Sequence, residues 1–164
     1  MDDVFERFLD DFLDDFLDDF LDDFLETPTM KKTVKSMVDE AMAAITTYSI
    51  DDARDLHGRD DVQFIDLRDV RELEREGVIP GAFHAPRGML EFWVDPESPY
   101  HKPVFSTPGT RYVLFCAAGW RSALATQTMQ QMGLDEVGHI DGGFTAWKAA
   151  GAPVAERAAA VKKG

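Results

Sequence analysis

One short stretch of the sequence combines a nucleophile, a flexible turn and a fixed positive charge. It reads Cys116-Ala117-Ala118-Gly119-Trp120-Arg121-Ser122. Cys116 is the only cysteine; residues 111–115 before it favour a strand, and residues 123–132 after the loop favour a helix. Backbone N–H groups at such a strand-to-helix turn favour negative charge, so they should stabilise the nucleophilic thiolate. A lone cysteine is also a common buried apolar residue, but this setting favours a reactive or anion-binding loop.

The other residues of the loop have types that suit a substrate site. Gly119 has no Cβ, so the loop can fold closely around the sulfur. Arg121 is permanently charged and should lie within reach of an anionic substrate. Ser122 should either cap the helix or donate a hydrogen bond. The predicted catalytic residue is therefore Cys116, and the predicted substrate-binding residues are Ala117, Ala118, Gly119, Trp120, Arg121 and Ser122.

Three stretches in this order resemble the rhodanese family of sulfurtransferases. The loop at 116–122 is the first, and the others read Asp66-Leu-Arg68 with Glu72 and Gly77 to Pro86, and Gly142-Gly143-Phe144-Thr-Ala-Trp147. The resemblance covers about residues 47–153. It implies an α/β fold: a rhodanese-like three-layer domain with a central, mainly parallel sheet and helices on both faces.

The resemblance also implies a reaction of the thiosulfate sulfurtransferase type. The Cys116 thiolate would attack the outer sulfur of a donor such as thiosulfate, and the resulting persulfide would pass sulfur to a thiol or cyanide acceptor. Arg121 would help to bind the anionic donor. This mechanism needs no metal and no organic cofactor.

Two other functions stay open at this point. A non-catalytic binding module could use the same fold, because fold alone does not establish activity. A phosphatase or arsenate-reductase-like enzyme is the other alternative. Tyrosine-phosphatase-type loops place arginine six positions after cysteine and histidine before it, whereas Arg121 is five positions after Cys116 and Phe115 precedes it. The shorter loop should fit sulfur better than a tetrahedral phosphate.

Three polar residues are predicted to form the framework near the site. Asp66 and Arg68 end a strand predicted over 63–68, and buried charges there need partners, so we expect them to hold neighbouring loops. Glu72 is expected to pair with Arg68. His84 is interpreted as a framework histidine that bonds backbone and not as a catalytic base.

Alternating strands and helices predict the parallel sheet independently of the resemblance. Strands are predicted over 63–68, 111–115 and 137–140, with another after a type II turn at Pro80-Gly81. Ligands of such sheets bind beyond the carboxyl ends of the strands. Cys116 falls at that edge.

The chain begins with an acidic extension, 1–29, in which Phe-Leu-Asp-Asp recurs every four residues. It is either disordered or helical, and it could dock on a protein partner or self-associate; its dense negative charge makes membrane binding the least favoured function. A linker helix is predicted over 30–46, either lying against the domain or carrying the repeat away. The rhodanese-like domain is predicted over 47–153, and 154–164 form a tail.

Charge and cysteine content exclude several classes of function. Residues 1–26 carry twelve acidic residues and one arginine, so they account for −11 of the formal net charge of −14. Nothing is basic enough for nucleic-acid binding. A single cysteine cannot form an intrachain disulfide and fits a reducing, cytoplasmic setting. The sequence shows no secretory signal peptide and no transmembrane segment.

Overall fold

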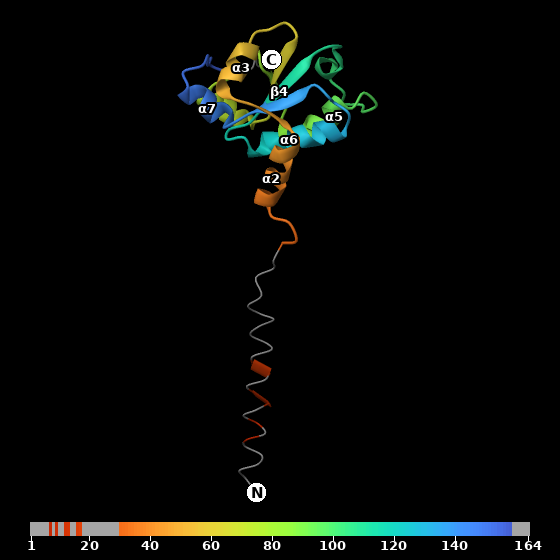
Figure 1. Ribbon diagram of the computed structural model, residues 1–164, viewed down its shortest axis with the longest axis vertical. Helices are drawn as coiled ribbons and strands as arrows, with labels where there is room; N and C mark the ends of the chain where they lie inside the picture. The colour runs from red at the N-terminus through yellow and green to blue at the C-terminus, as the bar shows by residue number, and fades with distance from the viewer. Residues whose placement is uncertain (1–6, 8, 10–11, 14–15, 18–29, 159–164) are drawn as a thin grey trace, which may run out of the picture. The chain divides into compact units, whose positions relative to one another are not determined.

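The computed structural model describes residues 7, 9, 12–13, 16–17 and 30–158 (Figure 1). The chain divides into two units, Met1–Thr33 and Val34–Gly164. In the first unit, residues 7, 9, 12–13 and 16–17 are helical, residues 30–33 are not, and the rings of Phe12 and Phe16 stack with their centroids 6.3 Å apart. Most of the repeat at 1–29 lies outside the described residues. Its choice between helix and disorder therefore stays a prediction.

The second unit alternates helices and strands along the chain. In order, the elements are α2 (Val34–Ala44), β1 (Thr46–Tyr48), α3 (Ile50–Leu56), β2 (Val62–Asp66), α4 (Val70–Glu76), β3 (Phe83–His84), a 3₁₀ turn (Arg87–Met89), α5 (Leu90–Val94), a second 3₁₀ turn (Pro103–Ser106), β4 (Arg111–Phe115), α6 (Trp120–Gln131), β5 (Val137–Ile140) and α7 (Gly143–Ala149).

The strands form one parallel sheet in the order β1-β5-β4-β2-β3, with β4 in the middle. Helices α5 and α6 cover one face, and α3 and α7 cover the other (Figure 1). Successive strand residues point to opposite faces, so Leu114 packs toward α6 while Phe115 packs among the side chains of α3 and α7. The predicted three-layer fold is confirmed.

Several elements differ from the sequence prediction. The linker helix expected over 30–46 spans Val34–Ala44, and the strand expected over 63–68 spans Val62–Asp66, so Arg68 follows the strand. The strand β1 was not predicted, because its three residues are largely exposed and show no apolar alternation; it forms by pairing with β5. Helix α6 begins at Trp120, three residues earlier than the predicted helix, so the arginine and serine of the loop belong to its first turn.

Helix α2 packs against the domain. Its buried residues Val38 and Ala41 contact Ala123 of α6. Small side chains at this contact let the two helices approach closely. Of the two placements that the sequence left open for the linker helix, the described structure shows the one against the domain.

Candidate active site

The loop after β4 is held from outside by the first turn of α7. The N–H groups of Phe144 and Thr145 donate to the carbonyl oxygens of Cys116 at 2.8 Å and Ala117 at 3.0 Å. In a trans peptide the N–H points opposite to the C=O. The N–H groups of Ala117 and Ala118 are therefore turned away from α7, into the interior of the loop.

The sulfur of Cys116 receives a backbone hydrogen bond from its own loop. Gly119 adopts a φ of 104°, a conformation that glycine reaches without a Cβ penalty. Its N–H donates to Sγ at 3.2 Å. Cys116 is only 1% exposed and ends the core layer beneath α6. The sequence-predicted turn thus encloses the sulfur and points a donor at it.

Ser122 hydrogen-bonds near the sulfur and does not cap the helix. The N-cap of α6 is Gly119, and Ser122 is the third residue of the helix. Its buried hydroxyl lies 3.6 Å from Cys116 Sγ and 3.1 Å from the carbonyl oxygen of Gly119. Of the two predicted roles, the hydrogen-bonding one fits this geometry.

Arg121 is paired with Glu72 of α4. Two nitrogens of the guanidinium donate to the two carboxylate oxygens, each at 2.8 Å. The predicted pairing of Glu72 with Arg68 is wrong, because the helical position of Arg121 brings its guanidinium onto that carboxylate. The hydrogen bonds from Arg121 lower the pKa of Glu72 to about 2. Glu72 in turn raises the pKa of Arg121, and the nearby Cys116 adds to that rise.

The framework residues are joined to one another and reach the loop through Phe144. Arg68, fully buried, binds Asp66 at 2.7 Å and the carbonyl oxygen of Gly77 at 2.9 Å. Its guanidinium lies 3.8 Å from the ring centroid of Phe144, the residue whose N–H holds the Cys116 carbonyl. His84 Nε2 hydrogen-bonds the carbonyl oxygen of Arg68 at 2.8 Å. These contacts match a supporting role.

Two residues that connect to the sulfur through Ser122 were not predicted from the sequence. His139 of β5 lies behind Ser122, with Nδ1 3.0 Å from its hydroxyl, and Nε2 lies 3.1 Å from Thr47 Oγ1 in β1. Burial lowers the pKa of His139, although Asp141 opposes the shift. A histidine inside a predicted strand carries little signal alone. Only the pairing of β1 with β5, which the sequence did not reveal, brings the two residues together.

Two hollows of the surface differ in their position relative to the cysteine loop, and the smaller one lies beside it. A hollow of about 190 Å³ lies beside the loop, lined by residues of α2, of the loop and of the end of β5: Val38, Asp39, Met42, Ala118, Gly119, Trp120, His139 and Asp141. Trp120 is half exposed there, at 52%.

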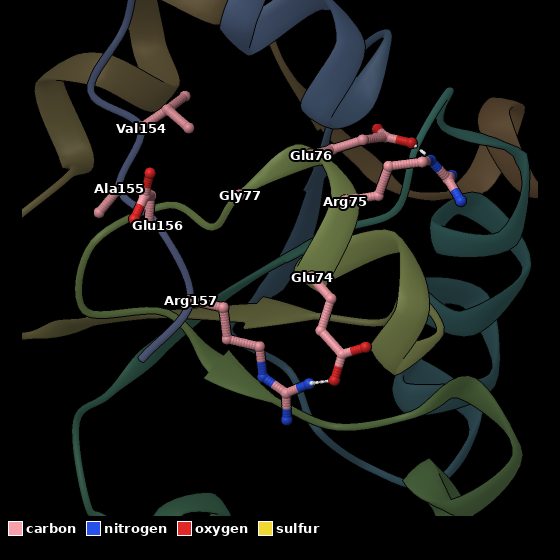
Figure 2. A pocket seen from close by; sticks show the side chains of 8 residues that line it. All are labelled: Glu74, Arg75, Glu76, Gly77, Val154, Ala155, Glu156 and Arg157. Carbon is pink, nitrogen blue, oxygen red and sulfur yellow. Dashed lines mark hydrogen bonds and ion pairs between the residues drawn. The ribbon is translucent and has the colours of Figure 1, made fainter. Parts of the chain in front are cut away.

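A larger hollow, of about 550 Å³, lies between α4 and the chain's C-terminal segment (Figure 2). Figure 2 shows Glu74 and Arg157 facing each other, joined by an ion pair of 3.1 Å. No residue of the cysteine loop lines this hollow, so its size does not make it the active site.

Two features are absent from the part of the chain that the structure describes. Among residues 7, 9, 12–13, 16–17 and 30–158, no three histidine, cysteine or acidic side chains gather as a metal-binding group. Within the same residues, no helix has the length and apolar character needed to cross a membrane.

Comparison with known families identifies the family to which this domain belongs. The family model of the rhodanese-like domain matches residues 49–150, more than half of the chain. The chain belongs to the rhodanese-like family. The match contains the cysteine loop and the two other stretches on which the sequence resemblance was based.

Solved structures of two proteins described as sulfur transferases are similar to this chain. A single-domain sulfurtransferase of Saccharomyces cerevisiae is 25% identical, with a TM-score of 0.52 over 66% of this chain and 92% of its own. A polysulfide-sulfur transferase homodimer of Wolinella succinogenes is 28% identical, with a TM-score of 0.59 over 79% and 92%.

One similar structure has a different description. A protein of Rhodopseudomonas palustris, described as of unknown function and a possible tyrosine phosphatase, is 52% identical to this chain. Its TM-score is 0.75, and the match covers 77% of this chain and 97% of that one.

Proposed function

We propose that this rhodanese-like protein is a sulfurtransferase that moves a sulfane sulfur from a donor such as thiosulfate to a thiol or cyanide acceptor. The observation that carries the proposal is the hydrogen bond of 3.2 Å from the Gly119 N–H to the sulfur of Cys116. It places a fixed donor where negative charge must be stabilised. Among relatives, a yeast sulfurtransferase and a polysulfide-sulfur transferase support this class of reaction.

In the first step the Cys116 thiolate attacks the outer sulfur of thiosulfate. A new S–S bond forms at Cys116, and the S–S bond of thiosulfate breaks, with sulfite leaving with the electron pair. The product is the Cys116 persulfide. The inward N–H groups of Ala117, Ala118 and Gly119 would hydrogen-bond its charged outer sulfur.

In the second step an acceptor attacks the outer sulfur of the persulfide. Cyanide leaves as thiocyanate, or a thiol leaves as its own persulfide, and the Cys116 thiolate is regenerated. Donor and acceptor therefore react in turn with one sulfur, which predicts ping-pong kinetics.

We propose that Arg121 helps to attract the anionic donor, although the Glu72 carboxylate offsets part of its positive charge. Its guanidinium is 42% exposed, but both ends of the Glu72 carboxylate bind it. The pair orients the first turn of α6, and the exposed part of the guanidinium is what would attract an anionic donor.

A phosphatase is the second candidate, because the Rhodopseudomonas palustris protein is described as a possible tyrosine phosphatase. The loop argues against it. Cys116 and Arg121 are five positions apart and not six, and Phe115 stands where tyrosine-phosphatase-type loops have histidine. A non-catalytic binding module remains the third candidate.

Parallel assays of the full chain separate the three candidates. We expect thiocyanate from thiosulfate and cyanide, with ping-pong kinetics, and no turnover by Cys116→Ser. Hydrolysis of p-nitrophenyl phosphate without thiocyanate would instead establish the phosphatase. Turnover of neither substrate, nor of persulfide donors such as polysulfide, would favour a binding module.

We further propose that residues 1–29 bind a protein partner or a second copy of the chain. The Wolinella succinogenes relative is described as a homodimer. A reducing compartment such as the cytoplasm would keep the single Cys116 thiol free for catalysis.

A further inference from the structure

A line of hydrogen-bonding side chains leads from the sulfur of Cys116 to the edge strand of the sheet. Sγ lies 3.6 Å from Ser122 Oγ, which lies 3.0 Å from His139 Nδ1. Nε2 of the same ring lies 3.1 Å from Thr47 Oγ1. Thr47 and His139 are register partners in β1 and β5, so the sheet itself sets the last of these distances.

The hydroxyl of Ser122 has one hydrogen and three acceptors within reach. They are the carbonyl oxygen of Gly119, His139 Nδ1 and the sulfur of Cys116. A neutral Cys116 thiol donates its own hydrogen to Ser122 Oγ. A Cys116 thiolate has no hydrogen to give, so it needs the Ser122 hydrogen to turn toward it.

The ring of His139 can decide where that hydrogen points. A neutral imidazole has one donor and one acceptor nitrogen. If Nδ1 carries the hydrogen, it donates to Ser122 Oγ and no longer competes as an acceptor. Nε2 then accepts from the Thr47 hydroxyl, whose only other acceptor among the described residues is the weak thioether sulfur of Met42, 4.0 Å away.

The surroundings of His139 favour the neutral ring. The side chain is 1% exposed, and burial lowers its pKa against the opposing effect of Asp141. From α2, Asp39 lines the same hollow, but Lys35 binds its carboxylate at 2.6 Å. From β4 and α6, the neighbours are Leu114 and Ser122, which are uncharged.

We propose that His139 and Thr47 are positioning residues that turn the Ser122 hydroxyl toward the charged sulfur of Cys116. Thr47 donates to Nε2, Nδ1–H donates to Ser122, and Ser122 donates to the thiolate. Hydrogen bonds aligned in one direction strengthen one another. The inference rests on the proposed role of Cys116 as nucleophile, and it adds two residues outside the loop to the control of that nucleophile.

Alkylation of Cys116 tests the line of hydrogen bonds without any sulfur donor. The full chain would be treated with iodoacetamide from pH 5.5 to 9.5, and the rate followed by intact mass, where the single cysteine makes the site unambiguous. Losing a hydrogen bond to a charged group predicts that Ser122→Ala slows the reaction about tenfold at neutral pH. The pH of half-maximal rate should also rise.

Variants at His139 separate positioning from packing. We expect His139→Leu to slow alkylation, as Ser122→Ala does. His139→Asn should keep most of the wild-type rate. The asparagine amide nitrogen can take the place of Nδ1, although asparagine also leaves a cavity. Equal loss in both variants would assign His139 to packing and overturn the proposal.

Variants in β1 give a test that does not depend on a buried substitution. Thr47→Val removes the hydroxyl of an exposed residue and should slow alkylation a few-fold, whereas the matched Thr46→Val, one residue away, should not. A Thr47→Val rate equal to that of wild type would remove Thr47 from the line and contradict the proposal. If these rates behave as expected but thiosulfate forms no persulfide, the proposed reaction fails while the positioning role stands.

Discussion

At the scale of single residues, the site depends on pairs that lie far apart in the sequence. Glu72 accepts the N–H of Asp69 at the start of α4 and also binds Arg121 at the start of α6. One carboxylate therefore caps one helix and anchors another. Its pKa is lowered to about 2 chiefly by the hydrogen bonds from Arg121.

This pair predicts a pH-dependent stability. The pKa of Glu72 in the folded chain lies below its ordinary value of 4.5, so its stabilisation is complete above about pH 4.5 and is lost as the pH falls toward 2. Glu72→Gln should lower the free energy of unfolding at pH 6 by about 1 kcal/mol, a modest value because water screens Arg121. Urea unfolding should show this difference shrinking below pH 4.5.

The control for that experiment is Glu74→Gln, which breaks the ion pair of a more exposed carboxylate of the same helix. Its effect should stay within about 0.5 kcal/mol. A Glu72→Gln difference that persisted unchanged down to pH 2 would show that the carboxylate is not held by Arg121.

The sequence identified the residues whose predicted roles follow from their positions within one loop. Spacing along one loop was enough to single out Cys116, Gly119 and Arg121. The partners of the loop were not accessible in this way: Glu72 was expected to pair with Arg68, and His139 was not considered. Both depend on the packing of helices and strands, which no local pattern encodes.

At the scale of elements, the first turn of α7 holds the cysteine loop in place. Gly143 has a φ of 60°, and a Cβ there would lie 2.8 Å from the carbonyl oxygen of Ala117 and overlap that of Cys116. Only glycine allows α7 to approach close enough for its N–H groups to bind those carbonyls. The same contact turns the loop's own N–H groups inward.

Gly143→Ala should therefore damage both stability and activity. We expect a loss of roughly 2 kcal/mol in the free energy of unfolding, from the left-handed backbone and the overlap, and at least a tenfold slower persulfide formation. Gly88→Ala, at a glycine with open space around it, is the matched control. Full activity in Gly143→Ala would mean that α7 does not shape the loop.

Elements with a strong apolar pattern were predicted well, and weak ones were not. Strands β4 and β5 have the predicted bounds because β5 is buried throughout and β4 is buried from Tyr112 onward. Strand β1 is short and exposed, so its identity comes from its partner strand and not from its own sequence.

At the scale of the whole molecule, the described structure supports a start of the folded domain that differs from the predicted one. The sequence placed the start of the domain at residue 47. The second unit starts at Val34, and α2 closes part of the core over α6. We therefore propose that the folded unit includes α2.

Two truncations test this boundary. A chain beginning at Val34 should keep its free energy of unfolding within about 0.5 kcal/mol, because all described core residues lie beyond that point. A chain beginning at residue 47 should lose roughly 2 kcal/mol, because it exposes the surface that Val38 and Ala41 cover. Equal stability of the two would place the boundary at 47, and thermal unfolding is the measurement.

The central claim is that Cys116 carries sulfur, and its most direct test is the intact mass of the full chain after incubation with thiosulfate. The account predicts a gain of one sulfur atom, roughly 32 Da, in the wild type but not in Cys116→Ser, and reversal of the gain by cyanide. A wild-type chain with a confirmed free thiol that gains no mass from thiosulfate, while a known sulfurtransferase does so in parallel, would contradict the account.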